Sequence, residues 1–251
     1  MAIYQFVTEL KNFKPRMWRR FVASSDMKLS HFAYAVMHMY GCQYEHLFSL
    51  AVEKEKSEIK SVRENNIIDV KDLFKRHKSQ KNAHEALNMM FNTDYLSMLS
   101  KETYYELPNE DLSRESEDIR KFKVSDVFKK VKDKARLDYD FGDGWEFKIV
   151  LEKILDEDAY VKEDLPLVLK GKIRGIIEDC GGPWALQDLV EKYPKTNEAT
   201  VDLSKVYLSE DELDWFGEDL EDILDFDVDE VNGGILDAIE SQEDYYESQL
   251  E

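Results

Sequence analysis

Three stretches near the N-terminus alternate apolar and polar residues with the period of two that is typical of β-strands. The first, Ile3–Leu10, is rich in β-forming side chains. Residues 16–22 and 44–52 alternate in the same way, with His46 on the apolar side of the last stretch. The pattern predicts three strands in this part of the chain.

Helical spacing appears between and after these strands. Apolar residues recur at intervals of three and four over 31–40, where Ser30 is placed to cap the first turn and Gly41 to end the helix. Similar spacing continues through much of the charged region 53–134, so we expect a helical insert there. The insert ends in a short predicted helix with Ser125 as its cap.

A β-hairpin is predicted where residues 136–141 and 145–154 flank a Gly-Asp-Gly sequence, because glycine supplies the positive φ that a chain reversal needs. The Asp-Phe-Gly triplet at 140–142 is also the magnesium-binding triplet of protein kinases. A kinase further requires a glycine-rich loop, a strand lysine and a His-Arg-Asp loop, and the sequence has none of them upstream. We therefore interpret the segment as a turn.

The C-terminal half continues with helical patterns. Pro183 is a residue favoured in a first turn and begins one predicted helix, and acidic and apolar residues alternate at helical spacing over 206–251. Together the patterns predict an α+β fold with a mainly antiparallel sheet and packed helices. Residues 1–205 would form the domain that contains the insert, and 206–251 an acidic helical region packed on it.

Composition indicates a globular protein with a sizeable core, since 43% of the 251 residues are hydrophobic. Glu9 and Lys11 interrupt the apolar run that a signal peptide needs, and no apolar run approaches the ~20 residues that span a bilayer. Cys42 and Cys180 fit no Cys-x-x-Cys pattern and imply no disulfide framework. We expect a cytoplasmic protein without a membrane partner.

The net charge of -20 is unevenly distributed. Residues 1–136 have 25 basic and 20 acidic residues, whereas residues 137–251 have 9 basic and 34 acidic ones. Because phosphate binding needs clustered basic residues, any nucleic-acid contact would use the N-terminal half. An acidic surface that serves solubility is the simplest explanation of the C-terminal half. Alternatively, its carboxylates imitate DNA and occupy a nucleic-acid-binding protein.

A small basic patch surrounds Trp18. Arg16, Arg19 and Arg20 beside this indole are the residue types that hold single-stranded nucleic acid by charge and stacking. Alternation along a strand, however, puts Arg19 and Arg20 on opposite faces. We expect these arginines to pair with carboxylates of the acidic half instead.

Several segments resemble, in their order along the chain, the plasmid pRiA4b ORF-3-like family. They are IYQFVTEL from residue 3, PRMWRRFVASSDMKLSHFAYAVMHMYGCQYEHLFSL from 15, VSDVF from 124, YDFGDGWEFKIVLE from 139, EDCGG from 178 and FDVDEVNGGIL from 226. The resemblance implies an α+β domain with a mainly antiparallel sheet, associated with plasmids and other mobile elements. It implies no established activity: some members are described as resolvases or insertion-element passengers, but the sequence has no recombinase serine or tyrosine constellation.

The chain departs from the family pattern at two places. The family usually has Gly-Asp-x-Trp-x-His; here Trp145 matches the tryptophan, but Phe147 takes the place of the histidine. The family usually has two prolines before Glu-Asp-Cys-Gly-Gly, where this chain has Ile176 and Ile177. If that histidine were catalytic or a metal ligand, this chain would lack the activity. The favoured explanation is a strand-face position that accepts an aromatic ring.

The Glu-Asp-Cys-Gly-Gly segment is one candidate site. Gly181 and Gly182 expose amides before a predicted helix, a geometry that binds anions, and Cys180 there could have a lowered pKa. Adjacent Glu178 and Asp179 oppose formation of the thiolate. A structural glycine turn with a buried thiol is therefore favoured, with the carboxylates as ion-binding or helix-capping groups.

A divalent metal site is the second candidate, and a metal is the one cofactor we consider. His46, which matches a position favoured in the family, could bind it together with Asp140, Asp143 and Asp179. The aspartates over 225–236 have the spacing of a calcium loop, but Gly and Glu are missing where an EF-hand requires them. We interpret that segment as the capped start of the final helix.

Two classes of function stay open. The first is a non-enzymatic accessory or interaction protein that binds a protein partner. The second is a metal-assisted enzyme, acting on nucleic acid, with His46, Asp140, Asp143, Glu178 or Asp179 at its metal. The absence of a complete catalytic signature, and Phe147 at the family's histidine, favour the first.

Overall fold

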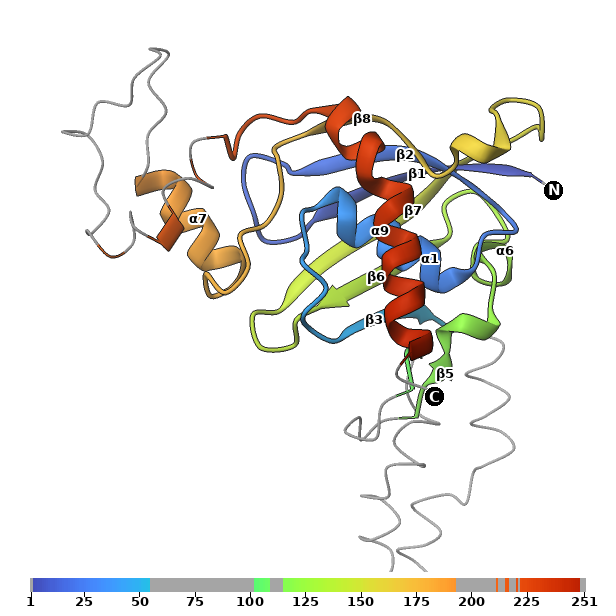
Figure 1. The fold of residues 1–251 in the computed structure, drawn as a ribbon, viewed down its shortest axis with the longest axis horizontal. Helices are drawn as coiled ribbons and strands as arrows, with labels where there is room; N and C mark the ends of the chain where they lie inside the picture. The colour runs from blue at the N-terminus through green and yellow to red at the C-terminus, as the bar shows by residue number, and fades with distance from the viewer. Residues whose placement is uncertain are drawn as a thin grey trace, which may run out of the picture.

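In the computed structural model, the part of the chain that is described comprises residues 2–54, 102–108, 115–192, 211, 215–216, 220 and 222–248. Its centre is an eight-stranded sheet in the order β5-β4-β3-β6-β7-β1-β2-β8 (Figure 1). Neighbouring strands are antiparallel except β4 and β5. The strands are β1 Ile3–Leu10, β2 Trp18–Ser24, β3 Phe48–Glu53, β4 Glu102–Glu106, β5 Glu117–Asp118, β6 Lys134–Tyr139, β7 Trp145–Leu155 and β8 Leu167–Lys172.

The described residues also form four α-helices and two short 3-10 helices, which confirms the α+β fold with a mainly antiparallel sheet. They are α1 Leu29–Met39, η1 Ile119–Lys121, α6 Val124–Val127, η2 Lys162–Asp164, α7 Gly182–Lys192 and α9 Val228–Ser248. Helix α1 lies against one face of the sheet, and α9 packs on α1 (Figure 1). None of the helices in the described ranges is long and apolar enough to cross a membrane.

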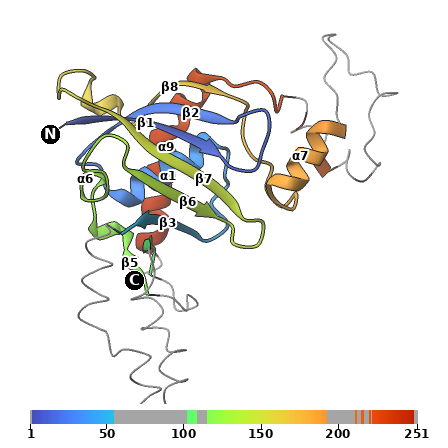
Figure 2. The same cartoon turned by 180° about the vertical axis from the view of Figure 1, so that it is seen from behind.

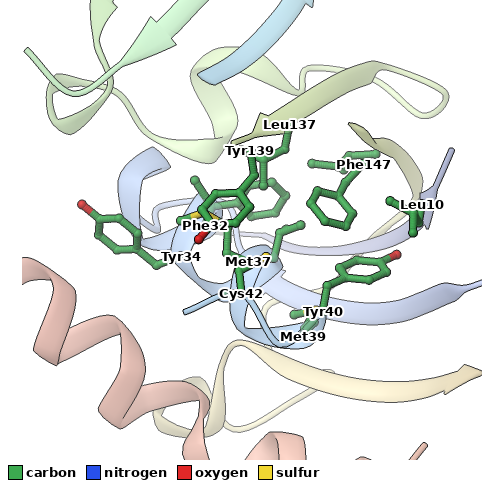
Figure 3. Packing of buried hydrophobic residues seen from close by; sticks show 14 of the residues in the cluster. Leu10, Phe32, Tyr34, Met37, Met39, Tyr40, Cys42, Leu137, Tyr139 and Phe147 are labelled. Atoms are coloured by element: carbon green, nitrogen blue, oxygen red, sulfur yellow. The ribbon is translucent and has the colours of Figure 1, made fainter. Parts of the chain in front are cut away.

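The core lies between α1 and the sheet face that it covers. Alternation along β1 turns Phe6 inward, where its ring contacts those of Phe21, Phe32 and Phe128 at centroid distances of 5.3, 4.9 and 4.9 Å. Such aromatic pairs contribute about 0.5–1.5 kcal/mol each beyond the area they bury. Further along the same cluster, Tyr139 lies with residues of α1 and the loop that follows it (Figure 3).

Two predicted helix caps are wrong. Helix α1 begins at Leu29, so Ser30 lies inside its first turn, buried, and not at the cap position. Ser125 likewise lies within α6, whose start is instead fixed by the Asp126 carboxylate, which accepts a 2.7 Å hydrogen bond from the backbone amide of Lys123. In both helices the serine therefore lies one residue inside the first turn, and a lysine, Lys28 or Lys123, takes the cap position.

The third strand is shorter than its alternation predicts. Strand β3 starts at Phe48, because Tyr44 has a φ of 68° and turns the chain out of the extended conformation. His46 therefore lies in a loop and not on a strand. This displacement brings its ring to the end of the sheet.

The helical insert expected over 53–134 is tested only in part. Residues 55–101 and 109–114 lie outside the described residues. From Glu102 onward the segment instead adds the strands β4 and β5 to the sheet, and α6 is its one described α-helix. In the tail, the predicted helix start is confirmed, since the Asp227 carboxylate accepts hydrogen bonds of 2.8 and 3.1 Å from the amides of Asp229 and Glu230 at the start of α9.

Candidate functional site

The candidate site lies where three loops meet at one end of the sheet: the loop after α1, the β6–β7 hairpin and the segment before α7. Backbone bonds hold these loops together. The amide of Asp140 donates to the carbonyl of Leu47 at 3.0 Å, and the amide of Ile176 donates to the carbonyl of Tyr40 at 2.9 Å. Residues far apart in sequence are thereby fixed side by side.

His46 lies at the centre of this site, among three carboxylates. Its Nε2 is 3.8 Å from Oδ2 of Asp140, 3.8 Å from Oε2 of Glu178 and 3.6 Å from Oδ1 of Asp179. These distances exceed those of a hydrogen bond. They are close to the separation of two ligand atoms bound to one ion, about 3.4 Å for ~2.1 Å bonds in tetrahedral geometry.

The hairpin turn orients Asp140. Its φ of 52° is in the left-handed region, and its Oδ1 accepts hydrogen bonds from the amides of Gly142 and Asp143 at 2.9 and 3.3 Å. The turn closes when the amide of Gly144 donates to the carbonyl of Asp140 at 2.7 Å. Because Oδ1 is occupied by the turn, Oδ2 is the oxygen that faces His46. The Asp-Phe-Gly triplet is thus a turn, as predicted.

The Glu178 carboxylate is fixed through Oε1, the oxygen that does not face His46. Its side chain is 6% exposed, and Oε1 accepts hydrogen bonds from the Tyr139 hydroxyl at 2.6 Å and the Gln43 amide at 2.5 Å. Asp179, in contrast, is 81% exposed and has a φ of 58°. The cluster therefore has a buried wall at Glu178 and an open side at Asp179.

Asp143 has a different role from the one considered for it. Its Oδ2 accepts hydrogen bonds of 3.1 and 3.0 Å from the amides of Gly181 and Gly182, at the start of α7. The ligand group that forms around His46 contains Asp140 and Asp179 but not Asp143. The two amides that could have held an anion are therefore satisfied by this carboxylate.

Neither cysteine has the properties of a nucleophile. Burial, with smaller contributions from Asp143 and Asp179, raises the pKa of Cys180 to about 11. Burial raises the pKa of Cys42 well above its usual value. Both thiols are free, and each is expected to stay protonated at neutral pH.

The comparison with known proteins decides the family. The plasmid pRiA4b ORF-3-like protein family matches residues 2–233. The chain belongs to this family. Among solved structures, the crystal structure of the protein of unknown function MM3350 from Methanosarcina mazei Go1 aligns with a TM-score of 0.58 at 20% identity, over 91% of this chain and 97% of that one. That similarity shows a shared fold. A comparison with curated proteins gives no match.

The two departures from the family pattern have structural explanations. Phe147 is buried in the core beside Tyr40 (Figure 3), and the two ring centroids are 4.4 Å apart. It is not part of the ligand group around His46. Trp145 is also fully buried. Ile176 donates the backbone hydrogen bond to Tyr40, which a proline cannot do.

The predicted basic patch is divided between two sides of the sheet, as alternation predicts. Arg19 is fully buried, and its guanidinium donates to the carbonyls of Met39, Trp18, Lys172 and Arg174. The expected pairing with the acidic half is correct for Arg20, which binds both oxygens of Glu152 at 2.7 and 2.9 Å. It is wrong for Arg16, whose partner is Glu9, and for Arg19, which has carbonyl partners.

A groove beside His46 was not predicted from the sequence. Its volume is about 610 Å³, and it is lined by Gln43, Tyr44, Glu45, His46, Leu47, Leu107, Pro108, Arg120, Gln242, Tyr245 and Tyr246. These residues come from four separate segments of the chain, 43–47, 107–108, 120 and 242–246, so no local sequence pattern could predict the groove. Tyr245 is 55% exposed, an unusual position for a large aromatic side chain.

Proposed function

We propose that the protein binds one divalent transition-metal ion through His46, Asp140 and Asp179, with Glu178 as a fourth group, and uses it in hydrolysis. The observation that carries the proposal is the convergence of the imidazole with three carboxylates at 3.6–3.8 Å. An ion at their centre would offset the repulsion among the carboxylates.

The donor set indicates the class of metal. Magnesium and calcium prefer oxygen ligands alone, whereas one imidazole with carboxylates suits zinc, manganese or iron. Glu178 and Asp140 are each held through one oxygen by neighbouring donors, which fixes the direction of the other oxygen. The exposed side at Asp179 leaves room for water, as hydrolytic metal sites require.

The first experiment is metal analysis of the purified, untagged protein by plasma mass spectrometry, followed by calorimetric titration with zinc, manganese, magnesium and calcium. We expect one ion per chain and at least tenfold weaker binding for His46→Ala and Asp140→Asn. Asp188→Asn, an exposed carboxylate paired with Lys192 on α7, is the matched control and should bind normally. Folded wild-type protein that binds none of these ions would refute the proposal.

Activity is tested separately with chromogenic esters and phosphodiesters on the metal-loaded protein. Hydrolysis that is lost in His46→Ala and kept in Asp188→Asn would establish the enzyme. Bound metal without turnover would make the ion structural, and the non-enzymatic interaction role would then take its place.

A protein-binding role is the second candidate, and the groove beside His46 favours it. Tyrosine, leucine and proline side chains line it, and aromatic residues are enriched where proteins bind partners. Tyr245→Ser should then abolish capture of a partner and leave metal affinity unchanged. Imitation of DNA stays a hypothesis; the described tail has exposed carboxylates along α9, and most of 193–221 lies outside the described residues.

A further inference from the structure

The sheet face opposite α1 has rows of side chains that run across five strands. Residues directly opposite one another in a sheet share a face, and the register places two such rows on this side. One row is Lys134, Val150, Val7, Arg20 and Lys170; the next is Arg136, Lys148, Glu9, Trp18 and Lys172. Figure 2 shows this face, formed by β6, β7, β1, β2 and β8, with α1 and α9 behind the sheet.

This face is basic although the chain is strongly acidic. On the five strands it has seven basic side chains, Arg20, Lys134, Arg136, Lys148, Lys153, Lys170 and Lys172, and four acidic ones, Glu9, Asp138, Glu146 and Glu152. The carboxylates are used in ion pairs with neighbouring arginines and lysines. Among the described residues, the lysines at 134, 153, 170 and 172 form no ion pair. The face therefore has a net positive charge in a protein of net charge -20.

The middle of the face is apolar and aromatic. A shallow groove of about 680 Å³ includes Val7 and Val150, with Arg20, Lys132 and Lys153 among the other residues that line it. Two strand positions further along, the half-buried ring of Trp18 has the guanidinium groups of Arg16 and Arg20 each 5.5 Å from its centroid.

We propose that this face binds single-stranded nucleic acid, and that the nucleic-acid chain crosses the sheet from β6 to β8. Four strand spacings of ~4.8 Å separate these two strands, a span of about 19 Å. The lysines on β6 and β8 would contact phosphates at the two sides, while bases lie over the valines and stack on Trp18 and the arginines beside it. The indole and guanidinium groups are what favour nucleic acid over an acidic peptide, because they offer stacking to a planar base.

The basic face is separate from the candidate metal site. That site is built from loops at one end of the sheet, and none of its ligands belongs to the strand rows described above. Nucleic acid bound on this face would contact both halves of the chain, whereas the charge distribution along the sequence predicts contact with the N-terminal half alone. Lys148, Lys153, Lys170 and Lys172 belong to the acidic half, and the fold places them on the basic face.

The test is fluorescence anisotropy of a labelled 15-nucleotide oligothymidine with the full chain, titrated from 50 to 200 mM salt. Wild-type protein should bind with an affinity that falls as salt rises. The double variant Lys170→Gln/Lys172→Gln should bind at least tenfold more weakly and lower the salt slope by about 1.4, since each phosphate contact to a single strand contributes ~0.7. Trp18→Ala should weaken binding about tenfold without changing the slope.

The control is Lys121→Gln/Lys123→Gln, which removes two exposed lysines, 75% and 57% accessible, that lie outside the strand rows. It should bind as the wild type does, and thermal unfolding would show that each variant is folded. Two results would overturn the proposal. One is no binding of the oligonucleotide by the wild type at 50 mM salt; the other is an equal loss of affinity in both double variants. Polyglutamate bound in place of the oligonucleotide would assign the face to an acidic protein instead.

Discussion

The hydroxyl of Tyr139 donates a 2.6 Å hydrogen bond to Oε1 of Glu178. Tyr139 is the last residue of β6 and its ring is buried in the core, whereas Glu178 lies in the segment that leads to α7. Burial raises the pKa of Tyr139, so its hydroxyl keeps the proton and stays a donor. The bond thus ties a wall of the candidate metal site to the core of the sheet.

Tyr139→Phe should weaken metal binding about tenfold, because the Glu178 carboxylate loses one of the two donors that hold it in place and keeps only the Gln43 amide. The expected loss of folding stability is about 1 kcal/mol, the usual contribution of one hydrogen bond. Calorimetric titration and urea unfolding measure the two effects separately. Metal affinity equal to wild type would show that the Tyr139 hydroxyl does not position a ligand of the metal.

Gly182→Ala should destabilise the protein by roughly 2–3 kcal/mol. The glycine has a φ of 86°, and an added Cβ would lie 2.2 Å from the carbonyl oxygen of Asp143. Both the strain and the clash would displace the hairpin from the start of α7. Chemical denaturation of the purified variant measures the loss.

Gly233→Ala is the matched control for this substitution. Gly233 lies within α9, and nothing is within 4 Å of the Cβ that alanine would add. Alanine should therefore stabilise the helix by about 0.5–1 kcal/mol. Similar losses from both substitutions would contradict the explanation offered for Gly182.

Local sequence patterns were sufficient to predict the strands and the hairpin, but not the contacts among the residues of the candidate site. Alternation predicts β1 and the two strands of the β6–β7 hairpin because one face of each strand is buried. The glycines between β6 and β7 predict the turn. The boundary of β3 was missed, since the positive φ of Tyr44 has no signature in a non-glycine residue. Residue type, and for His46 also its family position, predicted His46, Asp140, Asp143 and Asp179 as candidate ligands, but the distances among them depend on how three loops meet.

Other roles required tertiary contacts that no sequence pattern contains. Asp143 and Asp140 are three residues apart in one turn, yet one caps α7 and the other faces His46. The basic face depends on the register of five strands, which aligns lysines from both halves of the chain. The charge count for each half of the sequence therefore could not predict the basic face, because that face combines lysines from both halves.

Arg19→Lys should destabilise the fold by roughly 3 kcal/mol. The guanidinium lies 3.8 Å from the ring centroid of Phe226 and donates to four backbone carbonyls, which a lysine cannot reach together. Burial lowers its pKa to about 10, so it is still a cation at neutral pH. Urea unfolding gives the loss of stability.

The comparison variant for Arg19 is Arg16→Lys. Arg16 is exposed and pairs with Glu9, and exposed ion pairs contribute about 0–1 kcal/mol. Its stability should be within that range of the wild type. An Arg19→Lys protein as stable as Arg16→Lys would mean that the buried guanidinium is replaceable.

The packing of α9 on α1 should weaken in mild acid because of His38. Its Nε2 lies 3.1 Å from the carbonyl oxygen of Val231, and Gly234 of α9 packs closely against the ring. Burial lowers the pKa of His38 more than this hydrogen bond raises it, so the folded state favours the neutral ring. The unfolded chain, with a pKa of ~6.5, takes up a proton first as pH falls.

The stabilisation of the folded state by neutral His38 is therefore fully present above pH ~6.5 and is lost progressively as the pH falls below that value. His38→Gln keeps a donor for the Val231 carbonyl and cannot titrate. The variant should be less stable than the wild type at pH 8, but its stability should fall less than that of the wild type between pH 8 and 5.5. The difference between the two proteins in thermal unfolding isolates this histidine from the other titrating groups. Parallel pH profiles would show that His38 is protonated equally in the folded and unfolded chains.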